Sequence, residues 1–340
     1  MPPVTLLPGG GGSKGEAMQL NRRARDVVEP LLARPADFGA ACHRIGGAWV
    51  IDCGVRAAGG IEAGLVMARA ALAGLGTVAV HAAAAEPTCW PGCPWPAVAV
   101  GSQDPVAACL ASQYAGWRVK AAGYFAMASG PIRAAIGRED LYETLGLRER
   151  PETAVGLLEA AALPPEEVCR TLAEQAGVPP AALVLLVART ASVAGTLQVV
   201  ARSLETALHK LHDLHFDVTR IRAGRGLAPL PPVPADDLVA IGRTNDAILY
   251  GGTVTLDVTE AAAGLAEIGP RAVSGASPAA GATFLSLFER AGRDFYALDP
   301  ALFAPATLEL VSLSDGSRRR FGGPSPDIVA RSFTAADPGS

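Results

Sequence analysis

The strongest constraint on the fold is an unbroken apolar run that ends abruptly in polar residues. Residues 182–188 read ALVLLVA, and such a run is typical of a strand covered on both faces, as in the parallel sheets of α/β proteins. The sequence Arg189-Thr190-Ala191-Ser192 follows. From there the spacing predicts one helix of about twenty residues toward Leu214, and its start offers hydroxyls and N–H groups that can cap the helix or hold an anion.

Helices and strands alternate along the rest of the chain. Helical spacing and helix-start residues predict helices over 17–34, 62–75, 105–114 and 164–177, and another that begins at Asp236-Asp237. Strands are predicted over 77–83 and 97–100, and hairpins are predicted at Gly46-Gly47, Gly251-Gly252 and Asp315-Gly316. Because hairpins pair antiparallel strands, we predict an α/β fold with mixed sheets and some α+β character.

The length of the chain predicts two domains. A single hydrophobic core seldom serves 340 residues, so we expect an N-terminal α/β domain over 17–178, a C-terminal α/β domain over 179–335, and a cleft between them. Either domain could be assembled from non-adjacent segments. Residues 1–16 are expected to be a disordered tail, and the prolines between 229 and 234 form either a linker or a surface loop.

Composition excludes several classes of protein. Half of the residues are apolar and 18% are charged, which excludes a disordered chain, and a net charge of −4 offers no surface for a phosphate backbone. We therefore expect no nucleic-acid partner. No secretory signal and no stretch long enough to cross a membrane are found, so a cytoplasmic location is expected. Cys89 and Cys93, in the segment EPTCWPGCPWP, are interpreted as part of a structural loop rather than a metal site.

The predicted long helix carries a polar stripe. Arg202, Glu205, His209 and His212 are spaced by three, four and three residues and so share one helix face. Taken alone, this pattern is most often a solvated face. A zinc site on His209, His212 and His215 is the alternative, but steps of three drift around a helix, so these side chains would converge poorly.

Two further polar clusters stand among apolar residues. One is Ser129-Gly130-Pro131-Ile132-Arg133, and the other runs from Gly242 to Asp246. Each is compatible with a plain turn. Arg243, Asn245 and Asp246 also offer a donor fork, an amide and a carboxylate, which together suit the edge of a flat heterocycle.

Seven strings in order along the chain resemble one family. They are VIDCGV (50–55), GGIEAG (59–64), PWPAV (94–98), SGPIRA (129–134), RSLETALHKLHDLHFD (202–217), GRTNDAILYGG (242–252) and DPALFAPA (299–306). Together they closely resemble methenyltetrahydromethanopterin cyclohydrolase, over about residues 17–335. The resemblance implies reversible hydration of a methenyl group on tetrahydromethanopterin, a pterin site in the cleft between two domains, a homotrimer, and no metal or redox cofactor.

The resemblance also assigns site residues. The Arg-x-x-Glu pair that carries catalysis in the family falls on Arg202 and Glu205, with Glu205 as the general base for water and Arg202 holding the carboxylate and pairing with substrate oxygens. Candidates for the pocket lining are Lys120, Ser129, Arg133, Thr190, Ser192, Arg243, Asn245 and Asp246. Composition and family favour a bacterial formaldehyde-oxidation route. A non-catalytic pterin carrier and a metal-dependent hydrolase built on the three histidines are the alternative functions.

Overall fold

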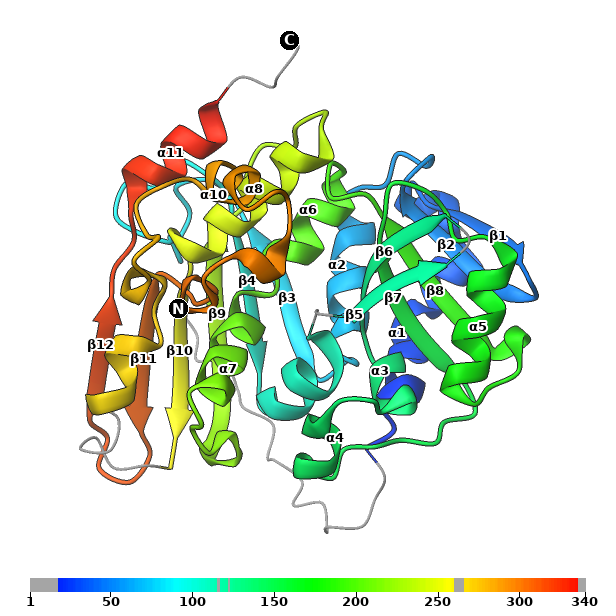
Figure 1. Ribbon diagram of the computed structural model, residues 1–340, viewed down its shortest axis with the longest axis horizontal. Helices are drawn as coiled ribbons and strands as arrows, with labels where there is room; N and C mark the ends of the chain where they lie inside the picture. The colour runs from blue at the N-terminus through cyan, green and yellow to red at the C-terminus, as the bar shows by residue number, and fades with distance from the viewer. Residues whose placement is uncertain (1–17, 115–116, 122, 260–265, 336–340) are drawn as a thin grey trace.

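Two mixed β-sheets organise the molecule. The structure is a computed structural model that describes residues 18–114, 117–121, 123–259 and 266–335 (Figure 1). Within these residues each sheet has six strands. The first sheet has the order β1 (Ala41–Ile45), β2 (Ala48–Gly54), β8 (Leu183–Ala188), β7 (Ala154–Glu159), β6 (Tyr124–Ser129), β5 (Trp117–Ala121). The second has the order β12 (Arg318–Gly322), β11 (Thr307–Ser312), β10 (Thr253–Val258), β9 (Ile221–Pro229), β4 (Ala97–Ser102), β3 (Gly76–His81).

Both sheets combine parallel and antiparallel pairs. Strands β2, β8 and β7 run parallel, whereas β1, β6 and β5 join this sheet through antiparallel pairs. In the second sheet β10 and β11 are parallel and the other neighbours are antiparallel. Every residue of β8 is buried, as the apolar run predicts. The predicted α/β class with mixed sheets is therefore confirmed.

Two helices form a layer that both sheets share. Helices α2 (Ile61–Ala71) and α6 (Val193–Val200) pack against each other between the sheets (Figure 1). On α6, Ala194 belongs to the core against the first sheet, while Leu197 and Val200 belong to the core against the second. A Cβ on Gly64 of α2 would lie 3.0 Å from the Cα of Ala194, so glycine permits this close approach.

The remaining helices pack into the same cores, on the opposite face of the first sheet and around the ends of the sheets. The α-helices are α1 (Leu20–Ala33), α3 (Ile132–Ile136), α4 (Asp140–Leu145), α5 (Glu166–Ala176), α7 (Ser203–Asp213), α8 (Asp237–Leu249), α10 (Phe284–Arg290) and α11 (Pro326–Thr334). A π-helical segment, η2, spans Val106–Gln113. Short 3-10 turns span Pro35–Phe38, Pro180–Ala182, Val218–Arg220, Gly269–Arg271, Ser274–Ala276, Phe295–Ala297 and Pro300–Leu302. No helix in these described segments is long and apolar enough to cross a membrane.

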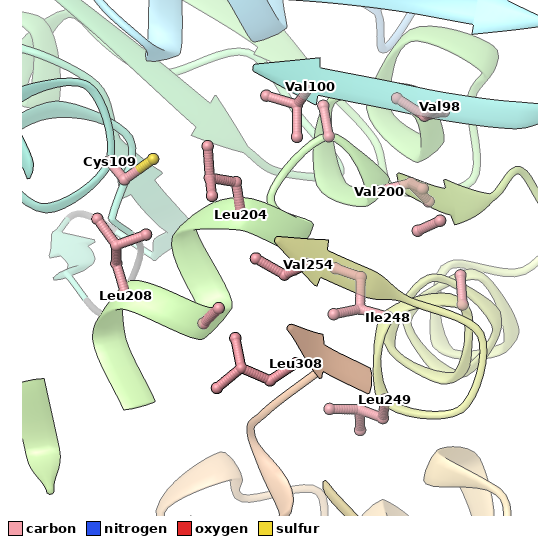
Figure 2. Packing of buried hydrophobic residues seen from close by; sticks show 14 of the residues in the cluster. Val98, Val100, Cys109, Val200, Leu204, Leu208, Ile248, Leu249, Val254 and Leu308 are labelled. Atoms are coloured by element: carbon pink, nitrogen blue, oxygen red, sulfur yellow. The ribbon is translucent and has the colours of Figure 1, made fainter. Parts of the chain in front are cut away.

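The largest core lies between the second sheet and its helices. Figure 2 shows Leu204 and Leu208 of α7 in the same cluster as Val100, Val254 and Leu308 of the strands. Each of these five side chains is almost completely buried. The burial of so many aliphatic side chains, at about 25 cal/mol per Å² of apolar surface, holds α7 firmly on this sheet.

Both sheets take strands from either side of residue 178. Strand β8 pairs with β2 and β7, and strands β3 and β4 join β9 in the other sheet. The sheets are thus assembled from non-adjacent segments, while the boundary between residues 178 and 179 stays a prediction. The proline-rich segment connects β9 to α8, which pack on the same core, so it is a loop and not a linker between the sheets. The predicted tail over residues 1–16 lies outside the described residues.

The prediction of one long helix after Ser192 is wrong, because the structure has two helices there. Helix α6 ends at Val200 and α7 begins at Ser203, with Ala201 and Arg202 in a turn between them. The reason is that α6 must lie between the sheets whereas α7 must lie on the second sheet. There α7 approaches β9 closely, since a Cβ on Gly226 would lie 2.4 Å from the Oγ of Ser203.

Two local predictions are also wrong. Residues 242–246 lie inside α8 and form no turn. The hairpin predicted at Gly251-Gly252 does not form, because Ile248 and Leu249 before it are the end of that helix and not a strand. The N–H of Gly252 donates to the carbonyl of Ile248 (3.0 Å), and β10 pairs with β9 and β11. A short apolar run such as Ile248-Leu249-Tyr250 has no periodicity that separates strand from helix. The hairpins at Gly46-Gly47 and Asp315-Gly316 are confirmed.

Candidate active site

The site begins at the carboxyl ends of the parallel strands of the first sheet. Strand β7 ends at Glu159, and strand β8 ends beside it at Ala188. Chain segments that leave such strand ends commonly form ligand sites in α/β proteins. Ser192 caps α6, because its Oγ accepts a hydrogen bond from the N–H of Gly195 (3.0 Å). The helix start predicted at this junction is therefore confirmed.

Arg202 and Glu205 form a buried pair at the start of α7. The Nε and Nη2 atoms of Arg202 each lie 3.4 Å from Oε2 of Glu205. Only 10% of the Arg202 side chain and 7% of the Glu205 side chain are exposed. The interpretation of this stripe as a solvated helix face is wrong for these two residues. A buried carboxylate and guanidinium need each other, because either one alone would be an uncompensated charge.

The π-helical segment η2 supplies a second contact to Arg202. The carbonyl oxygen of Gln113 accepts a hydrogen bond from Nη2 of Arg202 (2.8 Å), and the N–H of Tyr114 donates to the carbonyl of Cys109 (2.8 Å), five residues earlier. The Oε1 atom of Gln113 is buried and has no hydrogen-bond partner among the described residues. Such an acceptor is costly unless a water or ligand supplies a donor.

Tyr114 and Arg133 make a stack beside this pair. The Arg133 guanidinium lies 4.5 Å from the centre of the Tyr114 ring, and that ring lies 4.5 Å from the ring of His209. Arg133 is buried and forms an ion pair with Glu139. Burial, followed by the nearby charge of Glu205, raises the pKa of Tyr114 to about 12. The phenol is therefore a neutral hydrogen-bonding group at ordinary pH.

Four residues of this region were not predicted from the sequence. They are Gln113, Tyr114, Glu159 and Gln198. Gln198 precedes Arg202 by four residues, so helical spacing was a signal for it. Glu159 ends an apolar strand, but nothing local shows what faces it. Gln113 and Tyr114 sit at the end of an apolar helical pattern and reach Arg202 only through the tertiary fold.

The predicted pocket residues fall in different places. Thr190 is buried, and its Oγ1 donates to Glu159. Ser129 is buried at the end of β6. Lys120 is exposed on the edge strand β5, on the same face as Arg118, whose guanidinium lies 4.2 Å from the ring centre of Tyr296. Lys120 and Ser129 stay predictions as pocket residues.

The other cluster of predicted pocket residues lies in the middle of α8. Arg243 donates to the carbonyls of Pro232 (3.2 Å), Ser332 (3.3 Å) and Ala335 (2.8 Å). Asn245 donates to the carbonyl of Ile241 (2.8 Å), and Asp246 accepts from the N–H of Phe284 (2.8 Å). Arg243 and Asp246 thus connect α8 to neighbouring segments, including α10 and α11, whereas Asn245 bonds to a carbonyl within α8. Substrate binding by these three residues stays a prediction, and the described contacts do not join them to Arg202 and Glu205.

Asp246 makes the stability of the fold depend on pH. Burial is the main cause that raises its pKa to about 7, from about 3.9 in an unfolded chain. The folded state therefore binds this proton more tightly, so the contribution of Asp246 to stability is most favourable below about pH 4, falls as the pH rises toward 7, and is level above it. Asp246→Asn is expected to stabilise the protein by about 1–3 kcal/mol at pH 8 and by much less at pH 5.

Urea unfolding of both proteins at the two pH values measures this difference. The asparagine keeps an oxygen for the N–H of Phe284, so the ionisation is the main change. Identical pH dependence in the two proteins would show that Asp246 does not titrate with folding.

The three histidines do not form a metal centre. In the described parts of the chain, no group of three or more His, Cys, Asp or Glu residues could hold a metal ion. His209 instead pairs with Asp213 (Nε2–Oδ1 3.4 Å), and His215 lies beyond the end of α7 with a left-handed backbone, φ 62°. The metal-dependent hydrolase is therefore not supported.

Cys89 and Cys93 are buried beside Trp90, whose ring lies 6.1 Å from that of Trp95, as in a structural loop.

Comparison with known proteins identifies close relatives over nearly the whole chain. Residues 19–333 match the family model described as cyclohydrolase (MCH). A methenyltetrahydromethanopterin cyclohydrolase from Methylobacterium sp. (strain 4-46) is 44% identical, covering 92% of this chain and 97% of that protein. Proteins of the same name from Rhodopirellula baltica and Methanosarcina barkeri are 42% and 37% identical, covering 94% and 93% of this chain and 96% and 98% of their own lengths.

Proposed function

Since the chain belongs to the methenyltetrahydromethanopterin cyclohydrolase family and is a hydrolase of one-carbon metabolism, we propose that its buried Arg202–Glu205 pair is the catalytic centre. The reaction interconverts the 5,10-methenyl and 5-formyl forms of the one-carbon unit on tetrahydromethanopterin. The observation that supports this assignment is a carboxylate at the first turn of α7, oriented by a guanidinium that a backbone carbonyl holds in turn. The names of the relatives describe enzymes, so a non-catalytic carrier is not supported.

Glu205 acts as the general base in this proposal. The methenyl bridge is an amidinium cation, so its carbon is electron-poor before any contact with the protein. A water molecule between Glu205 and that carbon adds through its oxygen, and its proton passes to the carboxylate. The hydrated adduct then breaks its bond to the arylamine nitrogen, which takes up the proton from Glu205. The hydroxyl of the adduct loses its proton to solvent as the formyl C=O forms on the other nitrogen.

Arg202 positions the carboxylate and the oxygen of the adduct. Its bond to the Gln113 carbonyl fixes one side of the guanidinium, and the remaining N–H groups are directed to Glu205 and to substrate oxygens. Thr190 and Ser192 lie at the adjoining helix start, where hydroxyl and N–H groups suit polar parts of the pterin.

Four further properties belong to this proposal. The enzyme works without a metal or redox cofactor, because a carbon that is already cationic needs no Lewis acid to polarise it. It assembles as a homotrimer, acts in the cytoplasm, and runs in the direction of formaldehyde oxidation. The resemblance of the seven strings to the family supports the trimer, and the identity to a Methylobacterium protein supports the bacterial route.

Purified protein mixed with the methenyl compound tests the function. We expect the methenyl absorbance to disappear at an enzymatic rate, and we expect the rate to be the same after treatment with EDTA and dialysis. Stable absorbance together with tight binding would favour the carrier instead. A rate lost with EDTA and restored by Zn²⁺ would contradict the metal-free mechanism.

A further inference from the structure

A second carboxylate faces the proposed catalytic pair, and the mechanism above does not use it. Gln198 lies near the end of α6, and Arg202 and Glu205 lie at the start of α7. Glu159 is the last residue of β7. It accepts hydrogen bonds from the hydroxyl of Thr190 and from the side chain of Gln198, and it lies within the electrostatic range of Arg202.

We propose that Glu159 is the residue that makes this site prefer the cationic methenyl form of the substrate over the neutral formyl form. The inference rests on the proposed function, since it assumes that both forms bind beside Arg202 and Glu205. It assigns to Glu159 a role in selecting substrate charge, separate from the activation of water.

The charges around the site support this role. Arg202 and Glu205 neutralise each other, and Arg189 pairs with Asp237 at the start of α8 (Nε–Oδ2 3.0 Å). The negative charge of Glu159 is not part of either ion pair. Without it, a cationic ring system would bind beside two ion pairs whose charges cancel and beside the guanidinium of Arg202, which does not favour binding.

Burial and contacts act in opposite directions on the ionisation of Glu159, and the net effect raises its pKa. Burial raises its pKa, whereas the Thr190 hydroxyl, the Arg202 charge and Gln198 act against that rise, and Asp237 adds to it. A carboxylate held by neutral donors keeps its charge available for a ligand, unlike Glu205, whose charge is matched by an arginine.

Binding measurements in a variant with strongly slowed turnover test this proposal. In Glu205→Gln both forms can be titrated at equilibrium, so their dissociation constants are compared with those of Glu205→Gln/Glu159→Gln. We expect the second change to weaken binding of the methenyl cation about 3- to 10-fold and binding of the formyl form less than about 2-fold. Glu174→Gln, which removes an exposed carboxylate on α5, is the matched control and is expected to change neither.

Two outcomes would overturn the proposal. One is an equal shift, or no shift, for the two forms; an equal shift would indicate a structural role. The other is a methenyl affinity in Glu205→Gln that stays constant as the pH is lowered and Glu159 becomes protonated. This second measurement needs only the single variant, so it can be made even if the double variant does not fold. The proposed function is judged separately, by hydration in the unaltered chain.

Discussion

Glutamine at position 205 is expected to lower the rate of methenyl hydration by about 10²- to 10⁴-fold. Glutamine has nearly the shape of glutamate and can still accept a hydrogen bond from Arg202, but it cannot take a proton from water. The affinity for the neutral formyl form is expected to change little, so the loss falls on kcat. Stopped-flow measurement of the methenyl absorbance gives the rate, and thermal unfolding shows whether the variant is folded.

The exposed Glu174 again provides a control, because Glu174→Gln removes a carboxylate of the same chain far from any buried partner. It is expected to hydrate the methenyl compound at the unaltered rate. If Glu205→Gln retained a near-normal rate while the chain itself hydrated the methenyl compound, the base would be another group, and Glu159 would be the first to examine.

Alanine at position 195 is expected to destabilise the protein by about 3–5 kcal/mol. A Cβ at Gly195 would lie 1.8 Å from the carbonyl oxygen of Arg189 and 3.0 Å from the Oγ of Ser192. The backbone oxygen belongs to the turn between β8 and α6, which is held by buried elements on both sides. The methyl group can be accommodated only by moving α6 away from this turn.

Urea unfolding of Gly195→Ala measures the loss. Gly275→Ala is the matched control, because a Cβ there meets nothing within 4 Å and its backbone is not left-handed, so its stability is expected to stay within about 0.5 kcal/mol. A Gly195→Ala protein as stable as this control would mean that the β8–α6 turn is looser than the structure shows. Residual hydration by a folded Gly195→Ala protein would also report how well the turn positions Thr190.

The sequence predicts those parts of the site whose signals are local. The apolar run of β8 and the cap at Ser192 follow one another within ten residues, and both are confirmed. The hairpin of β1 and β2 is equally local, because two glycines specify its turn. The pairing of Arg202 with Glu205 is also local, since they are three positions apart at the start of α7.

The parts that the sequence does not predict depend on contacts between distant segments. The break at Arg202 arises because α6 packs against both cores whereas α7 packs only against the second, and no residue at 201–202 is a helix breaker by itself. The contact between Arg202 and the carbonyl of Gln113 joins residues 89 positions apart. Glu159 reaches the site only because β7 and β8 are neighbours in the sheet. Arg243 is a different case. Its sequence context suggests a ligand site, but its guanidinium donates hydrogen bonds to three backbone carbonyls of the chain itself.

The helix layer that both sheets share has a consequence for how the molecule comes apart. Helices α2 and α6 contribute apolar side chains to the cores on both of their sides. If one sheet lost its structure, one face of this layer would be exposed to water, and the other sheet would keep only a weakened support. The two halves are therefore expected to melt in a single cooperative transition, so damage far out on either sheet is transmitted to the turn that carries Arg202.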